Sequence, residues 1–133
     1  MPYVEKPRRS IWTWGFQKDE PTDEDRINHA GKLSRKLGME IKVPRIPVAG
    51  DLVLKKPRID LPDSLRHFCF TDNYERALHS YGAERELAAL GEFSNPPDVV
   101  AHPSDEVELE QVLEWCDKNK YVTIPYGGGS SVV

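Results

Sequence analysis

Three consecutive glycines near the end of the chain constrain its fold and chemistry more than any other feature. Gly127, Gly128 and Gly129 follow the apolar run 121–124 and precede two serines. Glycine adopts positive φ at little cost and has no Cβ to keep a ligand away from the backbone. A run of glycines lets several backbone N–H groups converge as an anion-binding nest. The sequence therefore predicts a phosphate-holding loop, with a tight turn or a flexible end as the alternative.

The residues before this loop have the pattern of a strand, a helix and a second strand. A short apolar strand is expected over 99–101, and Ser104 is expected to cap a helix over 105–118. The apolar residues of that helix recur at helical spacing: Leu109, Val112, Leu113 and Cys116. The run 121–124 predicts the second strand. A unit of this length predicts a right-handed crossover and a parallel pair, so the glycines would follow the carboxyl end of a parallel strand.

The chain before residue 96 is less regular. Thr22 and three acidic residues predict a helix that ends at Gly38, and its apolar positions are Ile27, Ala30, Leu33 and Leu37. Four prolines between residues 43 and 62 predict an extended surface segment. Thr71 is expected to cap a second helix with one apolar face, made of Tyr74, Ala77, Leu78 and Tyr81. Gly82 either bends this helix or permits a close approach, and the helix could continue over 87–90.

Composition excludes several classes of protein. A net charge of −4 over 133 residues gives no reason to expect nucleic acid. No apolar run approaches the length of a membrane span, and the N-terminus lacks the apolar stretch of a signal peptide. We therefore expect a cytoplasmic protein, with membrane association as an alternative. Cys69 and Cys116 have no metal-ligand spacing and are expected to be buried thiols.

One segment is nevertheless basic. Residues 32–58 hold eight Lys and Arg against two acidic residues, Glu40 and Asp51. A solvated surface is the first interpretation, and a patch that faces anionic lipid or a phosphorylated substrate is the second. Trp12 and Trp14 are two residues apart, so in an extended segment they would face the same way. We expect them to pack against the core, with contact to an acyl chain as the alternative.

The type of glycine loop can be narrowed by its neighbours. A Walker A loop needs Lys followed by Ser or Thr after its last glycine. Here Ser130 follows Gly129 directly, with no Lys between them. A dinucleotide fingerprint needs a third spaced glycine, which 127–132 lacks. Both common nucleotide loops are therefore disfavoured.

The pattern resembles a different family. The stretch 97–103, the acid-started helix and 124–132 are similar to the P-D-x-V-x-x-P, helix and P-x-G-G-G-T-S motifs of the vanillyl-alcohol-oxidase flavoproteins, with Ser130 in place of the usual Thr. The resemblance implies an α+β fold, with a helical and irregular region over 1–95 and the start of a PCMH-type FAD-binding domain over 96–133. It implies FAD as cofactor, held by Pro125, Tyr126, Gly127, Gly128, Gly129, Ser130, Ser131 and Val132.

Two further motifs resemble one branch of that family. The stretch 8–15 is similar to the R-x-x-x-W-x-W-G opening of alkylglycerone-phosphate synthases, and Arg76, His79 and Gly82 match their R-x-x-H-x-x-G. An S-x-x-D that often follows in bacterial relatives is lost at 84–87, which weakens the transfer of an exact substrate. The resemblance implies an ether-lipid enzyme that exchanges the acyl group of acyl-dihydroxyacetone phosphate for a long-chain alcohol. An FAD-linked D-2-hydroxy-acid dehydrogenase or oxidase and a non-catalytic module are the alternatives.

No catalytic residue is assigned within the chain, because residues that separate these chemistries are expected after Val133. His79 has two possible roles: it either packs against the helix or contacts a substrate phosphate or the cofactor. His102 is not assigned to flavin attachment, and His29 and His67 have no informative partner spacing. No metal site is expected. The expected partner is a small-molecule or lipid-like substrate, with a peripheral membrane contact and a homodimer left open.

Overall fold

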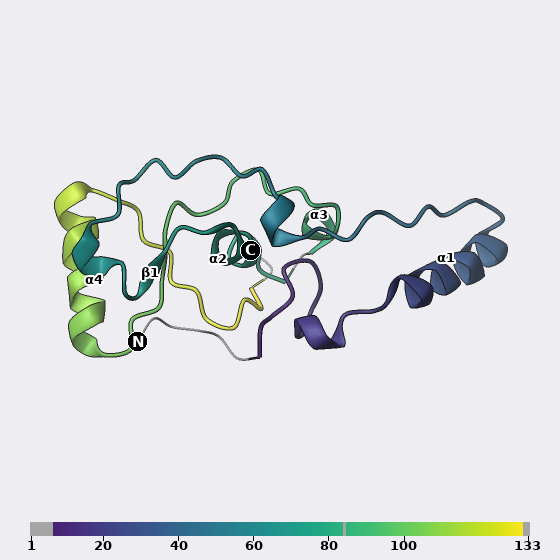
Figure 1. Cartoon of the computed structure of the whole chain (residues 1–133), viewed down its shortest axis with the longest axis horizontal. Helices are drawn as coiled ribbons and strands as arrows, with labels where there is room; N and C mark the ends of the chain where they lie inside the picture. Colours follow the sequence, from purple (N-terminus) through teal and green to yellow (C-terminus); the bar gives the residue numbers. More distant parts are fainter. Residues whose placement is uncertain (1–6, 84, 132–133) are drawn as a thin grey trace.

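The structure is a computed structural model that describes residues 7–83 and 85–131. Its elements follow the order α1 (Asp23–Leu37), β1 (Cys69–Phe70), α2 (Asn73–Leu78), α3 (Glu86–Ala89), β2 (Val100–Ala101) and α4 (Glu106–Asn119), with 3-10 turns at Gln17–Asp19, Ala49–Asp51 and Asp63–Leu65. Helix α4 forms one end of the molecule, α1 projects from the other, and α2 lies between them (Figure 1). Long irregular segments join these elements and carry much of the packing.

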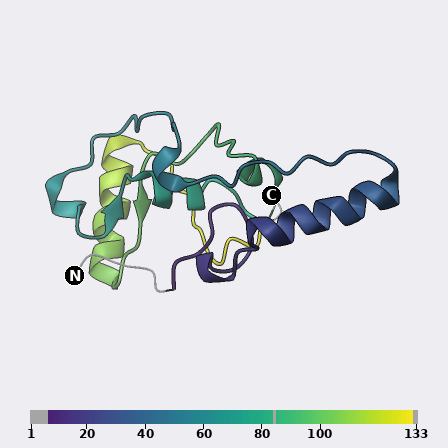
Figure 2. The same cartoon turned by 45° about the vertical axis from the view of Figure 1, so that its right-hand side comes forward.

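Helix α1 forms where the sequence predicts it. The Thr22 hydroxyl accepts from the Asp25 amide at 3.1 Å, the Asp25 carboxylate accepts from the Thr22 amide, and Gly38 ends the helix at φ +67°. Its apolar face is largely uncovered, because Ala30 is buried whereas Ile27 and Leu37 are exposed. Figure 2 shows the helix extending away from the rest of the chain.

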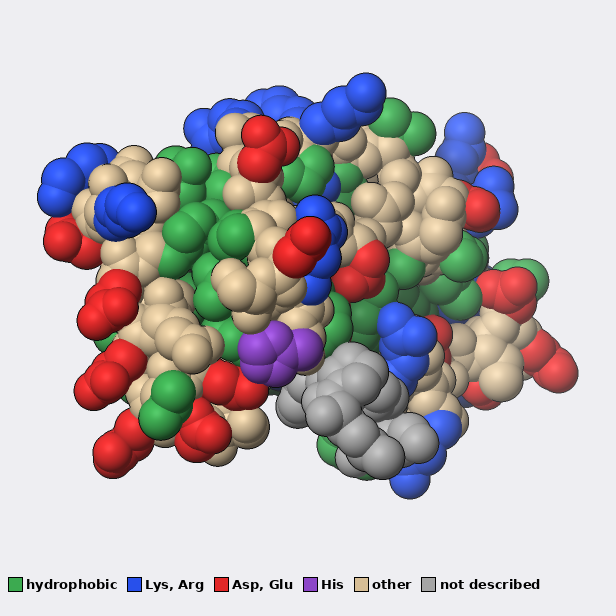
Figure 3. Space-filling model, turned by 60° about the vertical axis from the view of Figure 1, so that its left-hand side comes forward, with side chains coloured by type: hydrophobic (Ala, Val, Ile, Leu, Met, Phe, Trp, Pro, Cys, Tyr) green, Lys and Arg blue, Asp and Glu red, His purple; other side chains and the backbone are tan. Residues whose placement is uncertain are grey.

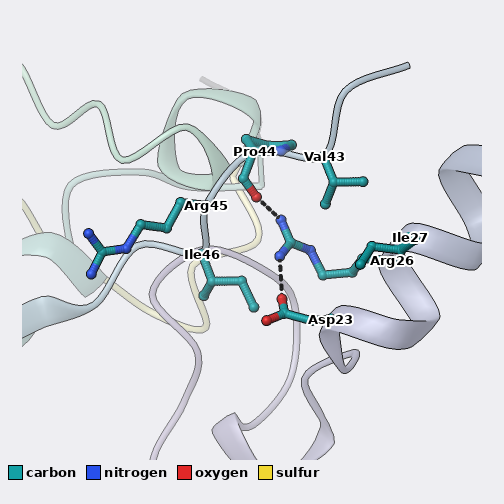
Figure 4. A pocket seen from close by; sticks show the side chains of 7 residues that line it. All are labelled: Asp23, Arg26, Ile27, Val43, Pro44, Arg45 and Ile46. Atoms are coloured by element: carbon teal, nitrogen blue, oxygen red, sulfur yellow. Dashed lines mark hydrogen bonds and ion pairs between the residues drawn. The ribbon is translucent and has the colours of Figure 1, made fainter. Parts of the chain in front are cut away.

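The base of α1 is tied to the proline-rich segment. The Arg26 guanidinium donates to Asp23 at 2.9 Å and to the Pro44 carbonyl oxygen, and the hollow around it measures about 480 Å³ (Figure 4). Apart from the turn at Ala49–Asp51, residues 43–62 form no helix or strand, which agrees with their proline density. Two of the eight basic side chains of 32–58 form ion pairs in the described structure, Arg45 with Asp51 and Arg58 with Asp98.

The buried residues form two clusters. One surrounds α2 and consists of Ile11, Trp12, Tyr74, Ala77, Leu78, Ala88 and Phe93. The other joins α4 to the 61–69 segment and consists of Leu61, Leu65, Phe68, Cys69, Val112 and Cys116. Both cysteines are thus buried free thiols, as expected, and burial raises the pKa of Cys69 to about 12.

The expected parallel pair of strands is wrong for this structure. Strand β2 pairs antiparallel with β1, so that Cys69 faces Ala101 and Phe70 faces Val100. Residues 121–124 run past α4 as an extended segment without ladder partners among the described residues, and Val122 and Ile124 are exposed. A strand needs a neighbour to satisfy its backbone N–H and C=O groups. Strand β1 is that neighbour for β2, whereas no described residues pair with 121–124.

Two helix starts differ from prediction by one residue. Asp72, not Thr71, caps α2 by accepting from the Glu75 amide at 3.1 Å. Asp105, not Ser104, caps α4 by accepting from the Glu108 amide at 2.8 Å. In each case an aspartate follows the predicted cap, and the carboxylate is the stronger acceptor toward the positive helix end.

The two N-terminal tryptophans do not face the same way. Trp12 is buried in the α2 cluster, whereas Trp14 is 54% exposed. The segment turns at this point, because the Ser10 amide donates to the Gly15 carbonyl at 3.0 Å and Gly15 has φ +91°. The expectation that residues two apart face the same way therefore fails here, since it holds only for an extended chain.

Figure 3 shows one face of the molecule, where Lys and Arg line much of the top edge and Asp and Glu the lower left edge. Both signs of charge occur together elsewhere on this face. Among the described residues, no helix combines the length and apolar character that crossing a membrane requires.

Candidate functional site

The glycine loop returns from the end of α4 to the C-terminal end of α2 (Figure 1). Tyr126 anchors it there, because its hydroxyl lies 3.1 Å from the Tyr81 carbonyl oxygen and 3.5 Å from that of Leu78. These carbonyls lie in the last turn of α2 and just beyond it, where helical acceptors lack intrahelical donors. The predicted loop thus docks on the segment that carries the R-x-x-H-x-x-G motif.

The far side of the loop is held by a close backbone approach. The Ala83 amide donates to the Ser131 carbonyl oxygen at 2.7 Å. A Cβ on Gly82 would collide with that same oxygen, so only glycine fits there without a backbone shift. Of the two roles open for Gly82, the structure supports the close approach.

The three glycines have different roles. Gly129 is buried at φ +69°, and a Cβ there would collide with the Tyr126 hydroxyl. Gly127 and Gly128 are exposed, and a Cβ on either would meet no atom within 4 Å. Gly129 is therefore required by the loop itself, whereas Gly127 and Gly128 leave their backbone open to a ligand.

The loop has backbone donors that the described structure leaves available. Within the described part of the chain, the amides of 127–130 donate to no backbone carbonyl. Unpaired amides in a glycine turn are the groups that bind phosphate oxygens in anion nests. Pro125 and Ser130 are exposed beside them, and Val132 lies outside the described residues.

A cluster of ionisable side chains lies directly behind the loop. Glu75 of α2 accepts from His102 Nε2 at 2.8 Å, and its Oε2 lies 3.6 Å from Nδ1 of His79. The ring centroid of His79 is 5.4 Å from that of His102 and 4.6 Å from that of Tyr126. The loop tyrosine thus packs against His79 at one side of the cluster.

Burial and charge shift the pKa values of this cluster. Burial raises the pKa of Glu75, but the hydrogen bond from His102 and the nearby positive charges outweigh it, so the net pKa is lowered. Burial lowers the pKa of His79 more than its bond to the Glu75 carbonyl and the Glu75 charge raise it. Glu75 is therefore held ionised, and His79 is held neutral.

We expect acidification to destabilise the chain through His79. Its folded-state pKa is below the ordinary value of 6.5, so the unfolded chain binds the proton more readily and stability falls as pH drops below about 6.5. The stability due to Glu75 is full above its ordinary pKa and is lost, in the same direction, as pH falls through its lower folded-state pKa. Urea unfolding between pH 7.5 and 5 measures the slope. The His79→Gln variant should show a smaller dependence of stability on pH. The control variant His29→Gln, on the exposed face of α1, should keep the full slope. An unchanged slope in His79→Gln would refute the assignment.

A hollow of about 590 Å³ opens beside the cluster and the loop. His102 and Tyr126 line one part of it, and His67, Ser104 and Glu108 line another. His67 Nε2 lies 3.1 Å from the Glu108 carboxylate, so His67 has a partner that spacing alone did not reveal. The hollow gives solvent and ligands a route to the cluster.

Sequence reasoning found the loop but missed the Glu75–His79–His102 cluster. Glu75 and His79 are four residues apart, a spacing that places them on one helical face, and this signal was available. His102 joins them only through the antiparallel pairing of β2 with β1, which the sequence did not predict.

Comparison with known proteins finds partial similarity to two enzyme types. The chain is 34% identical over 76 residues to the alkyldihydroxyacetonephosphate synthase of Dictyostelium discoideum, covering 55% of this chain and 12% of that protein. It is 30% identical over 105 residues to that of Trypanosoma brucei brucei, covering 72% and 16%. It is 34% identical over 62 residues to the mitochondrial D-lactate dehydrogenase [cytochrome] of Arabidopsis thaliana, covering 47% and 10%. No family model and no solved structure matches the chain.

These alignments agree with the motifs. They point to the same two enzyme types that the sequence patterns resemble. The chain spans between 10% and 16% of the length of these curated relatives. The similarity therefore concerns one part of each relative, and the activity of the whole protein is a matter for proposal.

Proposed function

We propose that the complete protein is an FAD-dependent enzyme in which the loop 125–132 holds the FAD pyrophosphate. The observation that carries this proposal is the contrast within the glycine run. Gly129 is needed for the fold of the loop, whereas Gly127 and Gly128 face open space with amides that make no backbone hydrogen bond in the described structure. The partial similarity to the synthases and to D-lactate dehydrogenase supports the same cofactor.

Each part of the site has a distinct task in this proposal. The amides of 127–130 donate to the phosphate oxygens, and the Ser130 hydroxyl adds a donor. Tyr126 and Gly82 hold the two sides of the loop in place before the cofactor arrives, which lowers the ordering cost of binding. The bound flavin supplies the ring chemistry that amino acid side chains lack. We assign no residue of this chain to the chemical step.

For the reaction, we propose exchange chemistry like that of alkyldihydroxyacetonephosphate synthase. Two relatives bear that name, and one of those alignments covers 72% of this chain. The second candidate is oxidation of a D-2-hydroxy acid, favoured by the D-lactate dehydrogenase alignment. Assays of the complete protein separate them. Conversion of acyl-dihydroxyacetone phosphate and a labelled long-chain alcohol to the labelled alkyl ether, with release of the fatty acid, supports the first. Flavin bleaching by D-lactate without such conversion supports the second.

The Gly128→Val variant tests the cofactor site. A valine side chain at this position meets no protein atom at its Cβ but occupies the space that a phosphate would enter. We expect the complete protein to lose most of its bound FAD, about 10-fold or more in affinity, with unchanged thermal stability of the apoprotein. Flavin absorbance per protein measures the loss. Gly50→Ala, also in open space and outside the loop, is the matched control, and full flavin content in Gly128→Val would contradict the site.

The 133-residue chain alone should bind FAD weakly. Each hydrogen bond from the loop contributes about 0.5–1.5 kcal/mol net, and these bonds must offset an association cost of about 4 kcal/mol or more. Pro125, Gly127 and Gly128 are exposed, so the described loop offers little apolar wall for the adenine or flavin rings. Calorimetric titration measures the affinity, and a submicromolar dissociation constant would contradict this expectation.

A further inference from the structure

The Glu75–His79–His102 cluster has a ligand set that the proposed flavin function does not use. One carboxylate and two imidazoles converge from α2 and from the residue after β2, and they are largely buried, with side-chain exposures of 10%, 8% and 18%. Their ligand atoms all lie within 4.8 Å of one another. We propose that these three side chains bind a divalent transition-metal ion, for which zinc is the best match.

The spacing of the ligand atoms is close to that of a zinc site. Tetrahedral zinc with bonds of about 2.0–2.1 Å separates its ligand atoms by about 3.3 Å. Here His102 Nε2 lies 2.8 Å from Glu75 Oε2, and His79 Nδ1 lies 3.6 Å from the same oxygen. These distances fall on either side of the required value. The widest separation in the cluster is up to 4.8 Å, so side-chain rotations that draw the two imidazole nitrogens together would admit the ion.

Ligand chemistry selects the class of metal. Two imidazoles and one carboxylate suit zinc and its neighbours in the first transition row, whereas calcium and magnesium prefer oxygen ligands alone. Three protein ligands leave a fourth position for water. The 590 Å³ hollow lined by His102 and Tyr126 supplies the room for it.

Two features oppose the ion and limit its affinity. The His79 Nδ1 atom lies 2.8 Å from the Glu75 carbonyl oxygen, so ligation through Nδ1 exchanges this hydrogen bond for a metal bond. Arg8 adds positive charge near Glu75. The two buried cysteines belong to the apolar cluster at α4 and are not among the three ligand groups that converge here.

The ion would have a structural consequence. It would join α2 to the end of β2 and fix the His79 ring, on which the Tyr126 ring of the glycine loop packs at 4.6 Å. Metal binding would therefore order the loop without touching FAD. The proposal is independent of the flavin function and can be tested on the chain without flavin.

Titration of the untagged, chelator-treated chain with Co²⁺ tests the site. We expect one equivalent to bind with the visible absorbance of a four-coordinate ion, and one equivalent of Zn²⁺ to displace it. His102→Gln and Glu75→Gln should weaken binding at least about 10-fold, whereas His29→Ala should leave it unchanged. Equal affinity in His102→Gln and the unsubstituted chain would overturn the proposal.

A measurement on the unsubstituted chain covers the case in which a variant fails to fold. Co²⁺ is paramagnetic, so it should shift or broaden the ring-proton signals of His79 and His102 at one equivalent, while those of His29, on the exposed face of α1, stay sharp. Broadening of His29 in parallel with His79 and His102, or no broadening at one equivalent, would overturn the proposal.

Discussion

Replacing Arg76 with Met should reduce the free energy of unfolding by about 3–5 kcal/mol, the largest loss that we expect from a single substitution outside the apolar clusters. Arg76 is 2% exposed. Its Nε donates to the Pro97 carbonyl and its Nη2 to the Lys55 carbonyl, each at 2.7 Å. The side chain thus joins α2 to two irregular segments, each 21 residues away in sequence. Met keeps the length of the side chain but leaves both carbonyls without this donor.

Urea unfolding of the chain measures this loss. Arg66→Met is the matched control, because the exposed Arg66 pairs with the exposed Asp63 at 2.7 Å and such surface pairs contribute about 0–1 kcal/mol. A loss in Arg76→Met no larger than that in Arg66→Met would show that the two carbonyl bonds do not hold the segments together.

Replacing Gly82 with Ala should detach the glycine loop. The new Cβ would collide with the Ser131 carbonyl oxygen, so the backbone of one segment must move. We expect a loss of about 1–3 kcal/mol in stability. The Ala83 amide, which donates to Ser131 at 2.7 Å, should exchange its hydrogen faster.

Hydrogen exchange followed by NMR measures both effects of Gly82→Ala. Gly31→Ala is the matched control, because the new Cβ meets no atom in α1 and alanine favours the helix by about 0.5–1 kcal/mol. Unchanged exchange at Ala83 in Gly82→Ala would mean that Ser131 does not lie against Gly82 in solution.

Local sequence signals predicted the local structure well. The ends of α1 follow from a capping box and a glycine, and α4 follows from an acidic start and apolar spacing, so both helices lie where expected. The cap shifts to Asp72 and Asp105 are errors of one residue, since Thr, Ser and Asp compete for the same role. The proline-rich segment forms no helix or strand apart from one 3-10 turn, as its prolines favour.

Features that depend on distant partners were not predicted. The residues 121–124 have strand composition but no neighbour within the described chain, and composition cannot supply one. The turn at Gly15 separates Trp12 from Trp14, and the pairing of β1 with β2 brings His102 to Glu75. Of the site, the sequence therefore predicted the glycine loop, and the three-dimensional structure added the segments that hold it and the cluster behind it.

The R-x-x-H-x-x-G motif now has a physical explanation. Arg76 fixes α2 in its surroundings, His79 supports the Tyr126 ring, and Gly82 admits the Ser131 carbonyl. All three positions serve the placement of one loop. The proposed FAD-dependent function depends on whether that loop binds a pyrophosphate.

Amide chemical shifts of the ¹⁵N-labelled chain test this claim most directly. Titration with ADP, which carries the pyrophosphate, should shift the amides of 127–130 most and leave α1 unchanged, even where binding is weak. FAD should shift the same amides, and adenosine, which has no phosphate, should not. Shifts centred on α1, or equal shifts of the loop amides with adenosine, would contradict a pyrophosphate site in the glycine loop.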